Sequence, residues 1–236
     1  MGCKTSTSRF STRSCSGSRR LIRARIQHHP SRAHLLPALV ESLGDLPTEV
    51  VEHSSDPPSP WAGYKLCMSD LPDKGHMLII QDDAFPVPGF IPAVHQIGQT
   101  HPDTPVCLYL ARFPRDTKPR VEAALKMGRR YVRLSQRSFM PIVAVLWPVA
   151  KLREFAEWGT DNPHLPGQRE PRSDDAMAGR WKMITRQEVL AAVPSIVQHP
   201  DEEPSTIGLT AMWGKDRARC AQFLADDASE YDWSMP

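Results

Sequence analysis

The chain has 236 residues, and its 29 lysines and arginines nearly balance its 27 aspartates and glutamates. This length suits one α/β domain with a sizeable core. The net charge of +2 excludes a protein that binds polyanions over its whole surface. No apolar run is long enough to cross a bilayer and we find no secretory signal, so we expect no membrane span. The five cysteines form no C-x-x-C pair, which argues against a structural zinc site and indicates a reducing, cytoplasmic location.

Residues 1–19 consist largely of serine, threonine and arginine and offer almost no apolar side chains to bury, so we expect a disordered basic tail. Organelle transit peptides have the same composition. A native flexible tail and a start site assigned too far upstream are the two simpler interpretations, and we favour these.

The first half of the chain alternates between strand and helix patterns. Apolar patterns predict three strands, over residues 21–27, 49–53 and 77–80. Helical spacing predicts two helices between them, over residues 35–43 and 61–70. Strands and helices in this order predict a parallel sheet with right-handed crossovers.

The second half continues less regularly. Further strands are predicted over residues 106–110 and 140–147, and helices over residues 90–97, 118–127 and 149–158, the last ended by Gly159. A helix also opens at Ser173, whereas residues 189–193 fit a helix or a strand equally well. The sequence is mixed and polar over 216–236, so we expect a flexible C-terminal tail there. The predicted fold is a single α/β domain over residues 20–215, with a Rossmann-like central mixed sheet flanked by helices.

Two adjacent carboxylates, Asp82 and Asp83, follow the third predicted strand. Ligands of open α/β sheets bind in the crevice beyond the carboxyl ends of the strands. Two like charges there are costly to bury unless a cation compensates them, and a divalent ion with oxygen ligands is the natural choice. The simpler alternative is a turn or a helix cap made by two aspartates.

Several phosphate-binding and catalytic motifs are absent from the chain. It contains neither of the glycine-rich phosphate loops, G-x-G-x-x-G and G-x-x-x-x-G-K-[ST], and it lacks G-x-S-x-G and H-E-x-x-H. If the sheet binds a nucleotide, something other than a glycine loop must hold the phosphates. A divalent ion on Asp83 would do so, because Mg2+ and Mn2+ bind through few carboxylates plus substrate phosphates.

Four segments, in this order, give the chain a resemblance to a known family. They are His28–Arg32 after the first strand, Gln81-Asp82-Asp83 after the third, Ser173-Asp174-Asp175 at a helix start, and Pro194–His199 leading to Ser205–Gly208. Over roughly residues 20–210 the chain resembles the nucleotide-sugar glycosyltransferases with the A-type fold, in particular short bacterial and phage members. Gln81-Asp82-Asp83 looks like a variant of the Asp-X-Asp motif of that family, with Gln81 in place of the first acid.

The resemblance implies a metal-dependent glycosyltransferase that uses Mn2+ or Mg2+. It would move a sugar from a nucleoside diphosphate sugar, with a UDP-sugar as the first candidate, to an acceptor hydroxyl. The acceptor would be a protein, a glycan or a modified nucleobase, and the location the host cytoplasm if the chain is phage-encoded. The resemblance also divides the domain into a nucleotide half, about residues 20–110, and an acceptor half, about residues 111–215.

The resemblance further implies roles for individual residues. Asp83 and His199 would bind the metal ion. The residues near the donor would be His29, Arg32, Asp56 and Asp82, the last binding the ribose or a water on the metal ion. Asp174 or Asp175 would face the acceptor. Because an acceptor hydroxyl needs a general base, we hypothesise that Asp175 is the base and that Asp174 supports or binds the acceptor.

Each assignment has a simpler alternative. His199 would be an ordinary loop histidine, and His28 and His29 a polar turn at a strand end. Asp174 and Asp175 would be acids that match the positive end of a helix dipole. Among the tryptophans, we expect Trp147, Trp158 and Trp181 in the core, whereas Trp61 in its proline-rich loop is the candidate to stack on a substrate.

Two other functions compete with glycosyl transfer. A nucleotidyltransferase acting on sugar phosphates would want a loop with glycine and lysine after the first strand, and residues 28–32 contain neither. A non-enzymatic nucleic-acid binding module would use the basic N-terminal arm, but it would also need a basic stripe on the folded domain. Arginine elsewhere in the chain is interspersed with acids.

Overall fold

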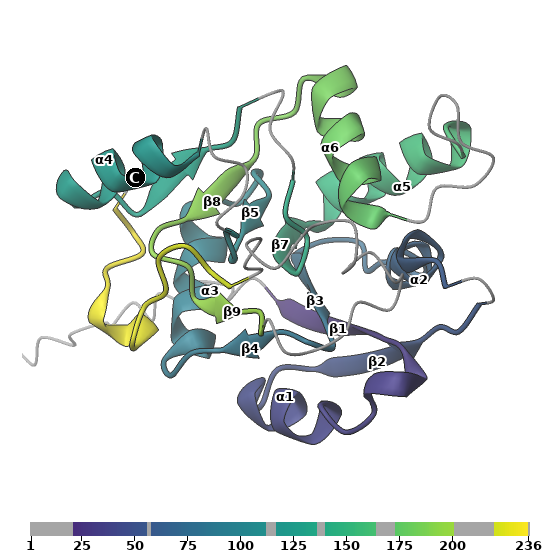
Figure 1. Ribbon diagram of the computed structural model, residues 1–236. Helices are drawn as coiled ribbons and strands as arrows, with labels where there is room; N and C mark the ends of the chain where they lie inside the picture. The colour runs from purple at the N-terminus through teal and green to yellow at the C-terminus, as the bar shows by residue number, and fades with distance from the viewer. Residues whose placement is uncertain are drawn as a thin grey trace, which may run out of the picture.

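A seven-stranded mixed sheet with helices on both faces forms the centre of the protein, as the sequence predicts (Figure 1). The computed structural model describes residues 21–55, 58–111, 117–135, 140–163, 173–200 and 220–235. The prediction of one α/β domain with a Rossmann-like central sheet is confirmed.

The strands of the central sheet follow the order β2-β1-β3-β7-β5-β8-β6. Their bounds are β1 (Ile22–His28), β2 (Thr48–Glu52), β3 (His76–Gln81), β5 (Val106–Cys107), β6 (Tyr131–Arg133), β7 (Ala144–Pro148) and β8 (Leu190–Ala192). β1 pairs in parallel with both β2 and β3, which confirms the parallel unit predicted for the first half. β7 runs antiparallel to β3 and β5, and β6 antiparallel to β8.

Helices cover both faces of this sheet. Their bounds are α1 (Leu36–Ser42), α2 (Pro60–Cys67), α3 (Phe90–Thr100), α4 (Lys118–Lys126), α5 (Val149–Asp161) and α6 (Asp174–Thr185), with 3-10 turns η1 (Pro30–Arg32) and η2 (Ala228–Glu230). Within the described residues, no helix has the length and apolar character that a membrane crossing requires.

Two clusters of buried apolar residues pack the helices against the two faces of the sheet. The first contains Ile22, Ala24 and Ile26 of β1 together with residues of α1 and α3. The second contains Met77 and Ile79 of β3 together with residues of α2, α4, α5 and α6. Because successive side chains of a strand point to opposite faces, the alternation along residues 21–27 places its apolar residues in one cluster, as predicted.

Aromatic rings fill much of the second face. Trp147 stacks on Phe155 with ring centroids 5.5 Å apart, and Trp181 lies 5.1 Å from the same ring. Trp147 and Trp181 are buried, and Trp158 is half-buried against the same cluster, which confirms their predicted place. Trp61 is also buried and packs on Phe155, so the suggestion that it stacks on a substrate is wrong.

Gly159 has a packing role inside α5 and does not end the helix, which continues to Asp161. A Cβ atom at this position would lie 2.8 Å from the Cζ2 atom of Trp61. Glycine therefore lets α5 approach α2 closely, and the prediction that it terminates the helix is wrong.

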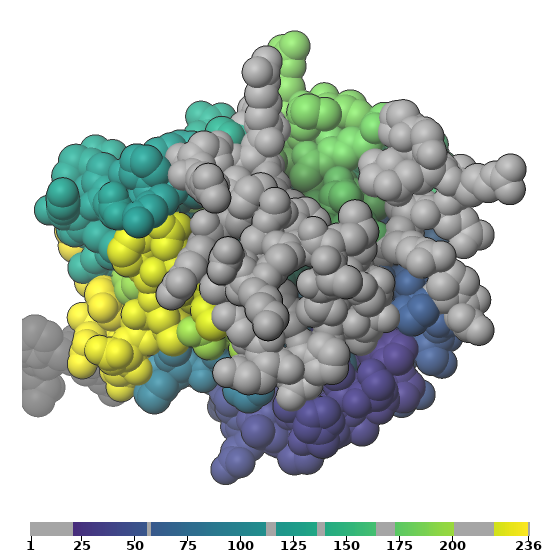
Figure 2. Space-filling model, in the orientation of Figure 1, coloured from purple at the N-terminus to yellow at the C-terminus, as the bar shows by residue number. Residues whose placement is uncertain are grey.

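The C-terminal residues pack on the domain, contrary to the flexible tail expected over 216–236. Trp233 is buried in the first cluster, and its Nε1 donates to the carbonyl oxygen of Ala228 at 2.8 Å. The Tyr131 hydroxyl donates to the carbonyl oxygen of Trp233 at 2.5 Å. Figure 2 shows residues 220–235 (yellow) on the same side of the surface as α4 (teal). Burial of Trp233, with Ala221, Ala225 and Ala228 in the same cluster, offsets part of the entropy lost when this segment is ordered.

The second half of the sheet is shorter and more broken than predicted. β5 contains only Val106 and Cys107, and β7 begins at Ala144 rather than at residue 140, after a stretch that includes Pro141. Proline cannot donate to a sheet ladder, which explains the late start. Residues 190–192 are extended and form β8, which settles the helix-or-strand ambiguity of that segment. β6 was not predicted, because three residues are too few to show a periodicity.

A second, two-stranded sheet lies beside the central one. It pairs β4 (Phe85–Pro86) antiparallel with β9 (Val197–Gln198), so that Phe85 faces Gln198. β4 starts two residues after Asp83, and β9 ends one residue before His199. This small sheet therefore joins two parts of the chain that are far apart in sequence.

Candidate functional site

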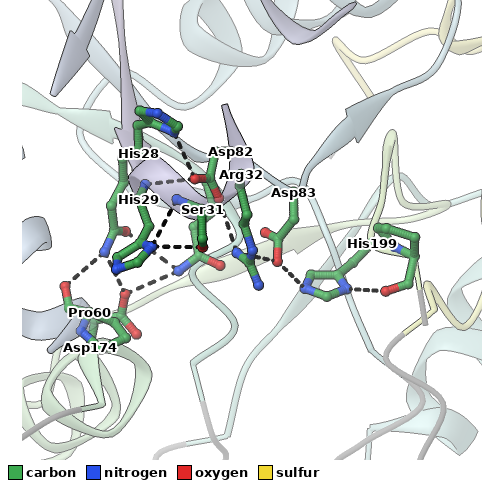
Figure 3. Close-up of polar contacts among 12 residues, drawn as sticks. His28, His29, Ser31, Arg32, Pro60, Asp82, Asp83, Asp174 and His199 are labelled. Atoms are coloured by element: carbon green, nitrogen blue, oxygen red, sulfur yellow. Dashed lines mark hydrogen bonds and ion pairs between the residues drawn. The ribbon is translucent and has the colours of Figure 1, made fainter. Parts of the chain in front are cut away.

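The carboxyl ends of β1 and β3 bring most of the predicted site residues together (Figure 3). After β1 the chain turns through η1, whose N-cap is His29, with Nδ1 accepting from the backbone N–H of Ser31. After β3 come Asp82 and Asp83. Because β1 and β3 are parallel neighbours, the two segments meet at one edge of the sheet. His29, Arg32, Asp82 and Asp83 therefore lie together, as predicted.

Asp82 holds the turn after β1 in place. One of its carboxylate oxygens contacts Nδ1 of His28 at 2.9 Å and accepts from the backbone N–H of His29 at 2.7 Å. The other accepts from Nη1 of Arg32 at 3.0 Å. The side chain is only 3% exposed. Three donors of the protein thus contact its two oxygens, and most of the acceptor capacity of Asp82 serves the fold.

Arg32 supplies a positive charge to both aspartates. Its Nη1 lies 3.0 Å from Asp82 Oδ1 and 2.6 Å from Asp83 Oδ2, and the guanidinium is largely buried. We expected two carboxylates here to require a metal ion for charge compensation. That expectation is incomplete, because a side chain of the protein already provides one cation for the pair. A metal ion would therefore add to Arg32 or take its place on Asp83.

His199 reaches the site through the small sheet. The pairing of β4 with β9 places it beside Asp83, and its Nε2 lies 3.0 Å from Asp83 Oδ2. The side chain of Gln198 fixes this position, since its Oε1 accepts from the backbone N–H of His199 at 2.9 Å and from that of Ala221 at 2.7 Å. His199 is 5% exposed. The alternative of a histidine on the surface of a loop is therefore wrong in its position, because the ring is buried against Asp83.

The ring of His199 has a defined tautomer. Its Nδ1 lies 2.9 Å from the carbonyl oxygen of Pro200, which can only accept, so Nδ1 carries a proton. With a neutral ring, the lone pair of Nε2 then faces the carboxylate of Asp83, and two acceptors 3.0 Å apart need a cation between them. Either a second ring proton or a metal ion satisfies this requirement. A backbone carbonyl on the far ring nitrogen is the usual arrangement behind a histidine that binds a metal.

The residues present fit a metal ion only in part. Asp83 and His199 offer one oxygen and one nitrogen ligand, and the described residues contain no group of three His, Cys, Asp or Glu that could hold a metal. Mg2+ commonly binds through one or two carboxylates plus substrate phosphates and keeps several waters. An aspartate with a histidine thus suits an ion that the substrate helps to hold, and it does not suit a permanent structural ion.

Asp174 lies at the other side of the turn after β1, away from His199 (Figure 3). Ser173, rather than either aspartate, is the N-cap of α6 and accepts from the backbone N–H of Ala176. Asp174 points toward the sheet, where its Oδ2 accepts from Nε2 of Gln27 at 3.2 Å and from Nε2 of Gln81 at 3.1 Å. The side chain is buried. It does more than match the helix dipole, although its position in the first turn also suits the dipole.

Asp175 follows in the first turn of α6, half-buried, with its carboxylate in contact with the hydroxyl of Ser173. Burial, followed by the charge of Asp174, raises the pKa of Asp175. Burial also raises the pKa of Asp174, although its amide donors oppose the shift. Both carboxyls therefore hold a proton more readily than an ordinary aspartate, as groups that exchange protons near neutrality do.

For three further residues, the sequence prediction and the structure compare as follows. Asp56 lies outside the described residues. Gln27 was not predicted, although its place as the last polar residue of the alternating first strand is the signal that could have found it. His28 was interpreted as part of a polar turn at a strand end, whereas it is the buried last residue of β1, and its Nδ1 contacts Asp82.

The basic residues of the first strand are partly structural. Arg25 is largely buried and bonds Glu49 through Nε at 2.8 Å. Its guanidinium also donates to the carbonyl oxygens of Cys67, Ser69 and Asp70, which follow or end α2. Arg25 is thus committed to the fold and is not available to contact nucleic acid.

A comparison with models of protein families gives no match for this chain, and a comparison with the sequences of curated proteins gives none either.

Proposed function

We propose that the protein is a metal-dependent glycosyltransferase that moves a sugar from a nucleoside diphosphate sugar, with a UDP-sugar as first candidate, to an acceptor hydroxyl. The observation that carries the proposal is the meeting of Arg32, Asp83 and His199 at the carboxyl ends of β1 and β3. These residues come from three distant segments, and each belongs to a segment on which the family resemblance depends.

The donor diphosphate would bind at this point. Arg32 supplies a planar cation of the kind that binds phosphate oxygens through paired hydrogen bonds. Asp83 and His199 would hold Mn2+ or Mg2+, which supplies Lewis-acid stabilisation of the diphosphate leaving group. Asp82 keeps the turn after β1 in place through His28 and the backbone of His29, and thereby positions Arg32.

The acceptor would bind on the α6 side of the site. In the transfer, a bond forms between the acceptor oxygen and the anomeric carbon, the bond from that carbon to the diphosphate breaks, and the hydroxyl proton passes to a base. We assign that proton to Asp175, because its raised pKa makes its carboxylate a stronger base than an ordinary aspartate. Whether the acceptor belongs to a protein, a glycan or a nucleobase is left to the assay.

We place the reaction in the cytoplasm. The described cysteines Cys67, Cys107 and Cys220 are free thiols, and the first two are buried. Free thiols are typical of a reducing compartment.

Calorimetric titration of nucleoside diphosphate sugars with and without Mn2+ tests the proposal. We expect UDP-sugars to bind in the presence of Mn2+, and excess chelator or Asp83→Asn to weaken binding at least about 10- to 100-fold, the range seen when metal sites are disturbed. Asp103→Asn, at an exposed loop position, is the matched control. Binding that persists undiminished in chelator and in Asp83→Asn would exclude the metal role.

The products separate the competing functions. A glycosyltransferase releases the nucleoside diphosphate, whereas a nucleotidyltransferase releases pyrophosphate or consumes it to release a sugar phosphate. Absence of both products, with salt-sensitive binding of nucleic acid by the full chain, would favour the binding-module alternative.

A further inference from the structure

Two glutamines hold a carboxylate of α6 at the end of the sheet. Gln27 of β1 and Gln81 of β3 are direct neighbours in the parallel pairing of these strands. Both side chains direct Nε2 at the same oxygen, Oδ2 of Asp174, at 3.2 and 3.1 Å. The other oxygen, Oδ1, accepts from the backbone N–H of Asp175 at 2.9 Å. A buried carboxylate thus has neutral donors on both oxygens.

The bonds also fix the orientation of both amides. A carboxylate oxygen only accepts, so each glutamine must present its amino group and not its carbonyl oxygen. Nε2 of Gln27 donates in addition to the carbonyl oxygen of Pro60, the first residue of α2, at 2.7 Å. Gly63 of α2 leaves room for this arrangement, because a Cβ atom there would lie 3.3 Å from Nε2 of Gln27. One amide group therefore ties the starts of α2 and α6 to β1.

We propose that Gln27, Gln81 and Asp174 form a latch between the nucleotide half and the acceptor half, with Asp174 a positioning residue rather than the base. The latch fixes the first turn of α6, from which Asp175 is presented to the acceptor. The role of Asp175 toward the acceptor rests on the function proposed above, whereas the contacts of the latch are a feature of the fold.

The latch accounts for the amide at position 81. A glutamate there, with the same reach as the glutamine, would place a second carboxylate close to that of Asp174 in a part-buried setting, where the two like charges repel. The position that departs from the Asp-X-Asp pattern of the resembled family is therefore the position from which Gln81 reaches α6.

A charge-swap cycle tests the latch. The four proteins are the wild type, Gln81→Glu, Asp174→Asn and the double variant, in which an amide on α6 would face a carboxylate on β3. The readouts are the Tm and the turnover of UDP-sugar hydrolysis in Mn2+, with water replacing the acceptor. Gln99→Glu on the exposed surface of α3 and Asp103→Asn are the controls for the two chemical changes.

Gln81→Glu should lower the Tm by roughly 10 °C, because it buries an uncompensated like charge in a chain of this size. Turnover should fall at least about 10-fold, since the first turn of α6 loses its position. Asp174→Asn should cost less in Tm, because one oxygen can still accept. The double variant should recover most of the Tm and most of the turnover.

Two results would overturn the proposal. Additive losses of Tm in the double variant would show that residues 81 and 174 are not coupled. Recovery of Tm without recovery of turnover would show that Asp174 itself handles the proton and is a catalytic residue. If the wild type hydrolyses no nucleotide sugar, the proposed function fails. The coupling of residues 81 and 174 in Tm then still shows whether the latch exists.

A second cycle covers the case in which Gln81→Glu does not fold. Gln81→Met and Gln27→Met keep the length of the side chain and remove its donor without adding charge. If the latch exists, each should lower the Tm, and each loss should be smaller when Asp174→Asn is already present. Equal losses in both backgrounds would contradict the latch.

Discussion

Two carboxylate pairs lie at the same edge of the sheet in opposite environments. Asp82 and Asp83, after β3, face charged or chargeable groups: the guanidinium of Arg32 and the rings of His28 and His199. Asp174 and Asp175, at the start of α6, face neutral amides, a hydroxyl and backbone N–H groups. The first pair lies beside a guanidinium and two imidazoles, whereas the contacts of the second pair within the described residues are with neutral donors.

The difference separates two kinds of chemistry. Carboxylates beside a guanidinium and imidazoles suit the binding of phosphate groups and a divalent ion. Burial raises the pKa of Asp174 and of Asp175 against the opposing effect of their neutral donors, and such carboxyls suit proton transfer. Glycosyl transfer needs a site that binds the charged leaving group and a base that removes a proton. The two environments lie on the two sides of the turn after β1 (Figure 3).

The largest effect that we expect from a change in one of the two pairs is the loss of turnover in Asp175→Asn. We expect the rate of hydrolysis or transfer to fall by about 10²- to 10⁴-fold, the usual contribution of a general base. Donor affinity, measured by calorimetry, should stay within a few-fold, because the base acts only in the transition state. Asp103→Asn serves as the control. Near-normal turnover in Asp175→Asn would show that the α6 pair does not supply the base through Asp175.

A second effect concerns the charge that compensates the first pair. Arg32→Met leaves Asp82 and Asp83 without the guanidinium, which should lower the free energy of unfolding by about 3–5 kcal/mol in chelator. Because a divalent ion can replace that charge, Mn2+ should restore part of the loss and stabilise Arg32→Met more than the wild type.

Urea unfolding with and without Mn2+ measures this, and Arg23→Met, at an exposed position of β1, is the control. If Mn2+ stabilises Arg32→Met no more than the wild type, the ion does not bind at Asp83, and the first pair serves phosphate through arginine alone.

The smallest effect is on the pH dependence of stability. Asp174 and Asp175 have raised pKa values in the folded protein, so the folded state binds more protons than the unfolded state between about pH 4 and the raised values. The stability they contribute is present below about pH 4 and is lost as the pH rises through that window.

The double variant Asp174→Asn/Asp175→Asn should therefore lose less stability between pH 4 and neutrality than the wild type, by on the order of 1–2 kcal/mol. Thermal unfolding across this pH range measures the difference, with Asp103→Asn/Asp161→Asn as the control at exposed positions. Identical pH profiles for the two double variants would show that the environment of Asp174 and Asp175 does not raise their pKa values above those of exposed aspartates.

The sequence predicted most accurately the strands whose apolar residues follow a short-range period. The alternation of β1 and the apolar run of β3 gave a parallel pair, and from that pair followed the meeting of Arg32 with Asp82 and Asp83. His199 could not be placed by periodicity, because only the pairing of β4 with β9 brings it to Asp83. The resemblance of segments, and not local pattern, indicated that contact.

The direction of Asp174 was missed for a similar reason. Its partners, Gln27 and Gln81, lie on strands distant in sequence, and nothing in the Ser-Asp-Asp segment shows that the first acid turns to the sheet. The packing of Trp233 was missed because the apolar side chains of this segment are spaced irregularly among polar residues and show no period. The turn after β1 also brings the guanidinium of Arg32 to Asp82 and Asp83, and the charge pattern of the sequence does not show this contact.

The small sheet of β4 and β9 has a consequence for how strongly a ligand binds. It consists of two residue pairs, includes Pro86, which has no N–H to donate, and leaves Phe85 exposed. So small a ladder should open more often than the central sheet, and each opening separates His199 from Asp83. The apparent affinity of any ligand that needs both residues is then the intrinsic affinity multiplied by the closed population. A ligand bound across the pair should in turn slow amide hydrogen exchange at Gln198, far more than in the strands of the core.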